Sequence, residues 1–306
     1  MNAPRTTELK NLVLVGKLSI ANWEAKKKAR AVEEKAEAAN GAIKGSVSAR
    51  KSLLPGAEKL EAIINHSKAM SRWWSDVSAP WFDNGMRVYN VAGHLDIQAA
   101  FGDMARMRDT LVNEFMDEYP ALREKARFDL NDLFDDEDYP MPEAVRAKFR
   151  TSLEIMPLPD TNDFRVIPGL DEAEAEYLIE EAQKKTTARM QEALSTTVTR
   201  VLVVLRTLAD RLAAYTEKET ADVKGNRFYE SWVDNVKEIA QLLPSLNLTN
   251  DPAISALANE IAASFDKPAL HYRDNAEDRM LATQRANELT RKLAGLLSCS
   301  LMGSSG

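Results

Sequence analysis

The stretch from Leu170 to Lys224 constrains the fold most, because it contains neither glycine nor proline. Gly169 precedes it and Gly225 follows it. At about 1.5 Å of rise per residue, a helix over the whole stretch would be roughly 80 Å long. Such a helix exceeds the diameter of a compact domain of this chain length. We therefore expect other helices to pack along it, or a partner to bind it.

Apolar residues recur within this stretch at alternating spacings of four and three, which is typical of a coiled-coil seam. They are Leu194, Val198, Val201, Leu205, Leu208, Leu212 and, at the end, Tyr215. The seam faces either helices of its own chain or a second copy of the chain. Both alternatives stay open, and the first six residues form a candidate self-association seam.

Shorter patterns predict a small β-sheet and further helices around the long one. Alternating apolar residues predict a strand over residues 11–20, and short apolar runs at 153–156 and 164–167 predict two more. Helical spacing or end signals predict helices at 23–40, from Pro55-Gly56 to Ser78, at 95–118, from Pro120 to Leu133, before Arg150, from Phe228 to Pro244, after Asn250, and at 274–297.

The predicted fold is therefore mainly α, a bundle of long helices around a rod-like helix at about 170–224. The small sheet comes from about 11–20, 153–156 and 164–167. No linker-like tract separates the halves, so we expect one elongated domain over residues 1–297 and a flexible tail over 298–306.

Composition places the chain among folded proteins of the cytoplasm. Of its 306 residues, 44% are apolar and 28% charged, and the net charge of −7 opposes binding to nucleic acid. Cys299 is the single cysteine, so no internal disulfide can form. No apolar run reaches the roughly 18 residues of a membrane span.

The loop around Trp81 is the main candidate for binding a partner. Trp73, Trp74, Trp81, Phe82, Asp83 and Arg87 are its candidate residues. Tryptophans provide large rigid apolar area, which suits either a buried structural corner or an anchor for a partner. The structural corner is the favoured interpretation.

Other candidate sites have ordinary explanations. The acidic run from Asp129 to Asp138 does not match a calcium-binding EF-hand loop, because Phe134 stands where glycine is needed. His66, His94 and His271 lack metal-ligand spacing, so neither a metal nor a cofactor is expected. The basic cluster from Lys26 to Arg30 is interpreted as a solvated helix face, although it could contact phosphate groups.

Several segments together resemble a family of phage and bacterial proteins that has no assigned activity. They are Ser52–Gly56, Ala79–Arg87, Tyr139–Pro142, Phe164–Gly169, Arg227–Asn235 and Leu246–Asp251. The resemblance implies a phage setting and genes that lie beside those of a MoxR-type AAA ATPase and a von Willebrand A protein. No catalytic residue can be transferred from it.

These observations favour a non-enzymatic interaction or scaffolding protein of the host cytoplasm. It would form a homo-oligomer or serve as a partner of the AAA ATPase system. The first alternative is a nucleic-acid-associated replication or recombination factor that uses Lys26–Arg30 and Arg279, Arg285 and Arg291. The second is an enzyme built on clustered carboxylates with a metal.

Overall fold

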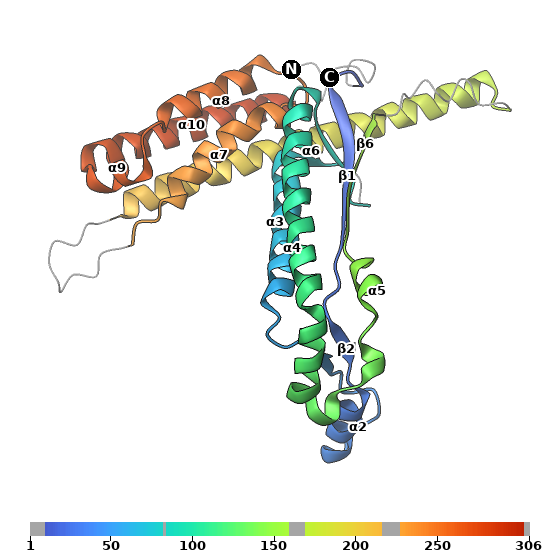
Figure 1. Cartoon of the computed structure of the whole chain (residues 1–306). Helices are drawn as coiled ribbons and strands as arrows, with labels where there is room; N and C mark the ends of the chain where they lie inside the picture. Colours follow the sequence, from blue (N-terminus) through green and yellow to red (C-terminus); the bar gives the residue numbers. More distant parts are fainter. Residues whose placement is uncertain (1–9, 82–83, 159–168, 216–226, 303–306) are drawn as a thin grey trace. The chain divides into compact units, whose positions relative to one another are not determined.

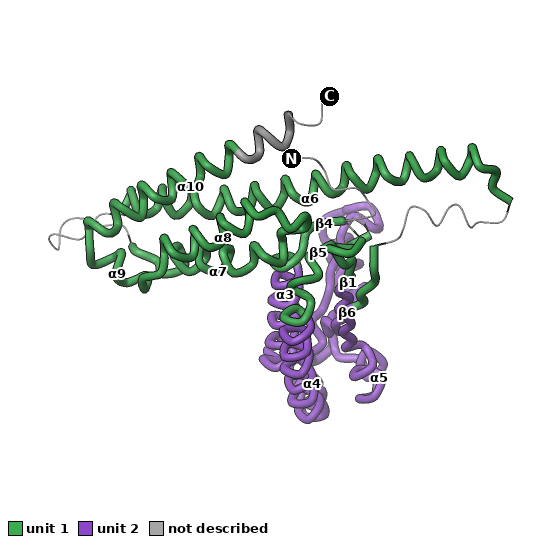
Figure 2. The backbone as a smooth tube through the Cα atoms, turned by 90° about the horizontal axis from the view of Figure 1, so that it is seen from above, with its two compact units in different colours: residues 1–17, 75–97, 154–306 green, residues 18–74, 98–153 purple. Residues whose placement is uncertain are grey.

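The computed structural model describes residues 10–81, 84–158, 169–215 and 227–302, with side chains up to residue 295. The chain divides into two compact units, coloured separately in Figure 2. Unit 1 comprises Met1–Lys17, Ser75–Ile97 and Glu154–Gly306, and unit 2 comprises Leu18–Trp74 and Gln98–Leu153. The expectation of one domain over 1–297 stays a prediction.

The fold is mainly α with a small β-sheet, as the sequence predicts (Figure 1). The helices are α2 (Arg30–Ala39), α3 (Glu58–Val77), α4 (His94–Leu130), α5 (Pro142–Arg146), α6 (Glu172–Ala214), α7 (Ser231–Leu246), α8 (Pro252–Ser264), α9 (Ala269–Asp274) and α10 (Ala276–Met302), with 3-10 turns η1 (Val91–Gly93), η2 (Asn131–Leu133) and η3 (Asp136–Asp138). The strands are β1 (Val13–Ala21), β2 (Lys26–Lys28), β3 (Arg50–Ser52), β4 (Ala79–Pro80), β5 (Arg87–Asn90) and β6 (Arg150–Pro157).

The main sheet has the strand order β4-β5-β1-β6, and β2 and β3 form a separate two-stranded ribbon. β1 pairs antiparallel with β5, from Val13 opposite Asn90 to Gly16 opposite Arg87. The predicted strand at 11–20 is confirmed as β1, and 153–156 lies within β6. The predicted strand at 164–167 lies outside the described residues.

The predicted rod is correct over most of its length but ends early. α6 begins at Glu172, where the Asp171 side chain accepts a hydrogen bond from the Glu174 N–H at 2.8 Å. It ends at Ala214, and Tyr215 already has extended backbone angles (φ −74°, ψ 124°). The prediction of helix through Tyr215 is therefore wrong, and 216–224 lies outside the described residues. α6 is about 65 Å long at 1.5 Å per residue.

The C-terminal half of α6 forms the main core of unit 1 with α7 and α10, which lie beside it, and with α8, which packs against α7 and α10 (Figure 1). Four predicted seam residues are at most 2% exposed in this core: Val201, Leu205, Leu208 and Leu212. Val198 packs against the same core, and Leu194 packs against the sheet. The seam thus faces helices of its own chain. A second copy could reach its buried residues only if the bundle opened.

The middle of α6 also supports the sheet in unit 1. Met190 and Ala193 are buried with Val13 and Val15 of β1 and Val88 of β5. Val13 and Val15 share one face because side chains alternate along a strand. This alternation is the pattern by which the sequence predicts β1.

Unit 2 has its own core, rich in aromatic side chains. Trp23 lies edge-on to Tyr119, with ring centroids 5.7 Å apart, and Phe115 and Ala126 are buried in the same cluster. Pro120 lies inside α4, so the predicted break into two helices is wrong. A proline inside a helix costs about 3 kcal/mol. Buried side chains on both sides of Pro120 offset that cost.

The predicted helix at 23–40 is only partly correct. α2 begins at Arg30 and ends before Gly41, whose φ of +60° suits the predicted glycine stop. The preceding residues form β2 instead. Trp23 and Ala25 are both buried, a spacing of two that a helix face does not allow, and Ala25 has a φ of +50°.

The C-terminal helices follow the prediction with small corrections. The Asp251 side chain caps α8 by accepting from the Ala253 N–H at 2.8 Å, as its sequence predicts. α7 contains Pro244 and ends at Leu246, so the predicted end of the helix at Pro244 is too early. α10 continues to Met302, so the prediction of a flexible tail is wrong for residues 298–302.

Candidate partner-binding surfaces

The tryptophans of the predicted partner loop are mostly buried. Trp74 and Trp81 are each 4% exposed, whereas Trp73 is partly exposed. Trp81 belongs to the core between β1, β5 and α6 in unit 1, and Trp73 and Trp74 belong to unit 2. Phe82 and Asp83 lie outside the described residues. The structural-corner interpretation therefore describes Trp74 and Trp81.

Arg87 of this loop is engaged within its own unit. Its guanidinium donates to the Ser75 carbonyl at 3.1 Å, to the Ser78 carbonyl at 2.7 Å and to the Ser78 hydroxyl at 2.8 Å. Arg200 of α6 donates to the carbonyls of Ser75 and Asp76. Burial, followed by repulsion from Arg200, lowers the pKa of Arg87. The two arginines satisfy the carbonyls at the end of α3.

The acidic run also has partners within the chain. The Asp138 side chain is 3% exposed and accepts hydrogen bonds from Lys27 of β2 and Lys51 of β3. Asp136 accepts from Arg123 and Arg127, at 2.9 and 3.0 Å. In the described part of the chain, no group of three or more His, Cys, Asp or Glu residues could hold a metal ion.

The three histidines lie apart and bond to different groups. His66 Nε2 lies 2.8 Å from the Met104 carbonyl oxygen, and His271 Nε2 lies 2.5 Å from the Asp278 carboxylate. His94 Nδ1 lies 3.0 Å from the hydroxyl of Tyr89, and burial raises the pKa of that hydroxyl to about 12. Among the described residues, no two of the three histidines bond to one another.

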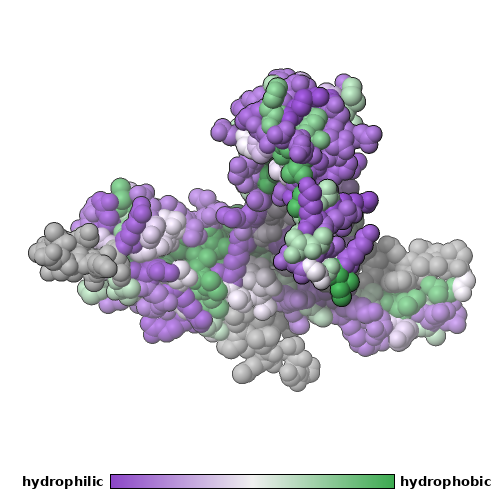
Figure 3. All heavy atoms as spheres, turned by 90° about the horizontal axis from the view of Figure 1, so that it is seen from below, coloured by the Kyte–Doolittle hydropathy of each residue, from purple (hydrophilic) through white to green (hydrophobic). Residues whose placement is uncertain are grey.

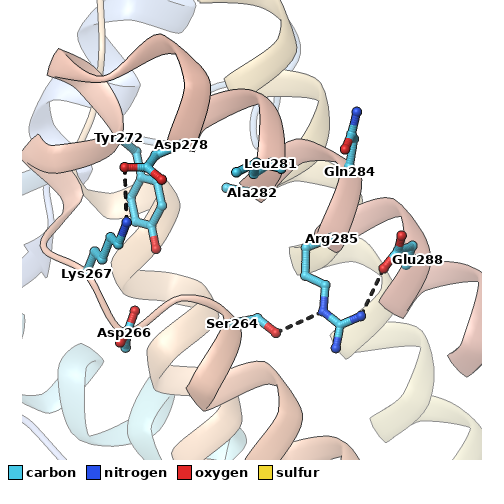
Figure 4. Close-up of a pocket in the computed structure, with 10 residues that line it drawn as sticks. All are labelled: Ser264, Asp266, Lys267, Tyr272, Asp278, Leu281, Ala282, Gln284, Arg285 and Glu288. Carbon is cyan, nitrogen blue, oxygen red and sulfur yellow. Dashed lines mark hydrogen bonds and ion pairs between the residues drawn. The ribbon is translucent and has the colours of Figure 1, made fainter.

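A cavity of about 340 Å³ lies between the end of α8, α9 and α10 (Figure 4). Its two cations, Lys267 and Arg285, pair with carboxylates. Lys267 lies 3.0 Å from Asp278, and Arg285 lies 2.9 Å from Glu288. Arg285 also bonds to Glu260 at 2.7 Å, which α8 supplies. With its cations already neutralised, the cavity offers no strong site for an anionic ligand.

Aromatic side chains gather where α6 ends and the chain enters α7. This aromatic surface consists of Tyr215, Phe228, Tyr229 and Trp232, with Arg227 and Arg279 beside them. Phe228 lies 5.2 Å from Tyr215 and 5.1 Å from Trp232, measured between ring centroids. Phe228 lies edge-on to Tyr215 and tilted against Trp232, so the rings form one connected group.

The arginines extend this aromatic surface. The guanidinium of Arg227 lies 5.3 Å from the centroid of the Tyr229 ring, within the range of a cation–π contact. Tyr229 is 49% exposed, and Tyr215, Phe228 and Trp232 are partly exposed. On the face drawn in Figure 3, hydrophobic residues appear as green groups among hydrophilic ones.

Exposed tryptophan, tyrosine and arginine in one patch are the composition of an energetic centre in protein–protein contacts. The sequence analysis did not select this patch as a site. The sequence does contain a sign of this patch, because three aromatic residues fall within the segment Arg227-Phe-Tyr-Glu-Ser-Trp232. What the segment alone does not show is that Tyr215 and Arg279 join it in space.

Comparison of the chain with models of protein families, with curated proteins and with solved structures finds no match. Within the described residues, no helix has both the length and the apolar character needed to cross a membrane.

Proposed function

We propose that the protein is a non-enzymatic interaction or scaffolding protein and that the aromatic surface of unit 1 is its main contact with a partner. The observation that carries this proposal is the exposure of Tyr229 beside Trp232 and Arg227. Burying exposed aromatic area favours association, and tryptophan, tyrosine and arginine are the residue types that most often dominate the binding free energy. The rings lose little conformational freedom on binding because they already pack against one another.

Two partners fit the proposal. One is a second copy of the chain, which would make the protein a homo-oligomer. The other is the MoxR-type AAA ATPase or von Willebrand A protein implied by the resemblance of the sequence to phage and bacterial proteins. In either case the protein would work in the host cytoplasm. The long helices would support the contact surface without taking part in chemistry.

Light scattering on the full chain over a range of concentrations, together with capture of the two purified candidate partners, tests this proposal. We expect either a mass above that of one chain or capture of a candidate partner. Tyr229→Ala with Trp232→Ala should weaken the contact by about thirtyfold, which corresponds to a 2 kcal/mol hot spot.

Tyr177→Ala is the matched control, because Tyr177 is a 62% exposed tyrosine of α6 outside the aromatic surface. It should leave binding unchanged. A chain that stays monomeric and captures neither partner would refute the interaction role. Equal losses in Tyr177→Ala and in the double variant would show that the aromatic surface is not the contact.

A further inference from the structure

The ribbon of β2 and β3 places like charges directly opposite one another. Its register sets Lys27 opposite Lys51 and Lys28 opposite Arg50. Two cations in such positions destabilise a strand pair. An anion placed between two such cations offsets their repulsion. A negatively charged group beside each pair would therefore stabilise the ribbon.

The first pair has its anion inside the chain. Asp138 of η3 accepts hydrogen bonds from both Lys27 and Lys51, and Lys51 Nζ lies 2.6 Å from its carboxylate. Lys27 is therefore occupied and does not belong to an open basic patch. Asp138 shows how one face of the ribbon holds an anion between opposed cations.

The second pair lies on the other face of the ribbon, because side chains alternate along a strand. Lys28 reaches Glu33 at 3.2 Å, but Glu33 also accepts from the Ala49 N–H at 2.9 Å. For Arg50, the described part of the chain provides no ion pair. Arg50 is exposed, so its guanidinium is open to solvent.

The start of α2 adds to the positive potential. Arg30 is the first residue of this helix, and the Ala29 side chain before it cannot cap the helix. A cation in this position is unfavourable, since the N-terminal end of a helix dipole is positive. Uncapped N–H groups at this end bind phosphate in many proteins. Arg30, like Arg50, forms no ion pair with a described residue.

We propose that Arg30 and Arg50, with Lys28 beside them in its ion pair with Glu33, form a basic face that binds the phosphate backbone of nucleic acid. Cations from both a ribbon and a helix start suit successive phosphates better than one small anion. Arginine is favoured for such contacts because its planar guanidinium matches a phosphate group. The face is local, since the whole chain carries a net charge of −7.

Fluorescence anisotropy of labelled duplex and single-stranded DNA, titrated with the full chain at several salt concentrations, tests the proposal. We expect binding that weakens as salt rises, with no strong dependence on base sequence. Arg30→Gln with Arg50→Gln should weaken binding about tenfold at low salt. The slope of log affinity against log salt should fall by about 1 for each lost contact.

Lys68→Gln with Arg72→Gln is the matched control, because both residues are exposed cations of α3 in the same unit. It changes the net charge equally and should leave affinity and slope unchanged. Arg30→Lys with Arg50→Lys should retain most of the binding. Absence of binding by the natural chain at low salt, equal losses in the control, or preference for anionic vesicles over DNA would each overturn the proposal.

Discussion

The guanidinium carbon of Arg279 lies 4.9 Å from the centroid of the Tyr215 ring, so that α10 holds the residue that follows the last residue of α6. The same guanidinium donates to the carbonyls of Tyr272 and Arg273, at 3.0 and 2.8 Å. One side chain therefore joins the ends of α6 and α9 to α10. This arrangement also places Tyr215 against Phe228 in the aromatic surface.

Arg279→Ala should lower the free energy of unfolding by about 2 kcal/mol. It removes two hydrogen bonds from a charged donor and one cation–π contact. Urea denaturation followed by circular dichroism measures the change. Arg291→Ala is the control, because Arg291 is exposed and, among the described residues, bonds within its own helix to the Asn287 carbonyl. A loss no larger than that of the control would contradict the linking role of Arg279.

The tryptophans of the predicted partner loop should differ in their effect on stability. Trp81→Ala should cost about 3–5 kcal/mol, because a 4% exposed ring leaves a cavity in the core of unit 1. Trp73→Ala should cost much less, since Trp73 is partly exposed. Thermal melting of the two variants compares them directly. Equal shifts in melting temperature would contradict the burial of Trp81.

The sequence predicts those parts of the fold that local periodicity determines. β1 and most of α6 follow from spacings of two and of about 3.6 residues, and the start of α8 follows from Asp251 and Pro252. The errors lie where tertiary packing decides. Pro120 stays inside α4 because buried side chains before it, such as Phe115 and Tyr119, and Ala126 after it hold the helix in the core of unit 2.

The candidate surfaces could be predicted less well than the fold. The opposed charges of Lys28 and Arg50 depend on a strand register between segments that the sequence alone does not pair. The lysines at 26–28 do not form one basic patch, because Lys27 forms an ion pair with Asp138. Likewise, periodicity in α6 shows an apolar face but cannot show that α7 and α10 already cover it.

Asp138→Asn should destabilise the protein at neutral pH and reduce its sensitivity to acid. Burial acts to raise the pKa of Asp138, but hydrogen bonds from Lys27 and Lys51 outweigh it and lower the pKa below its usual value. A lowered pKa contributes stability above the unfolded value of about 3.9, and this is lost as the pH falls through the folded value.

At pH 7 we expect Asp138→Asn to lose about 2 kcal/mol, since Lys51 is left without its carboxylate. Below pH 3 the free energies of unfolding of the natural chain and of the variant should differ less. Urea denaturation at pH 7 and below pH 3 measures both differences. Asp129→Asn is the control, because Asp129 is exposed and pairs only with Lys125, at 3.9 Å on its own helix. A difference that stays constant with pH would show that Asp138 does not act through its charge.

Asn90 is fully buried at the end of β5, and each of its polar atoms has a partner. Its amide nitrogen donates to the Asn247 carbonyl at 2.6 Å and to the Asn250 side-chain oxygen at 2.7 Å, and its oxygen accepts from the Ala92 N–H at 2.8 Å. The network fixes the turn between α7 and α8 to the sheet within unit 1. It depends on a side chain that is donor and acceptor at once.

Asn90→Ala should therefore cost about 2–4 kcal/mol, because it leaves buried donors and acceptors unpaired. Asn90→Asp tests the direction of the bonds. An ionised carboxylate would face the Asn247 carbonyl, so this variant should lose more stability at pH 7 than at pH 4, where protonation restores a donor. Asn235→Ala, at an exposed position of α7, should change stability by less than about 0.5 kcal/mol. If Asn90→Asp is equally stable at both pH values, the amide nitrogen is not the group that holds the turn.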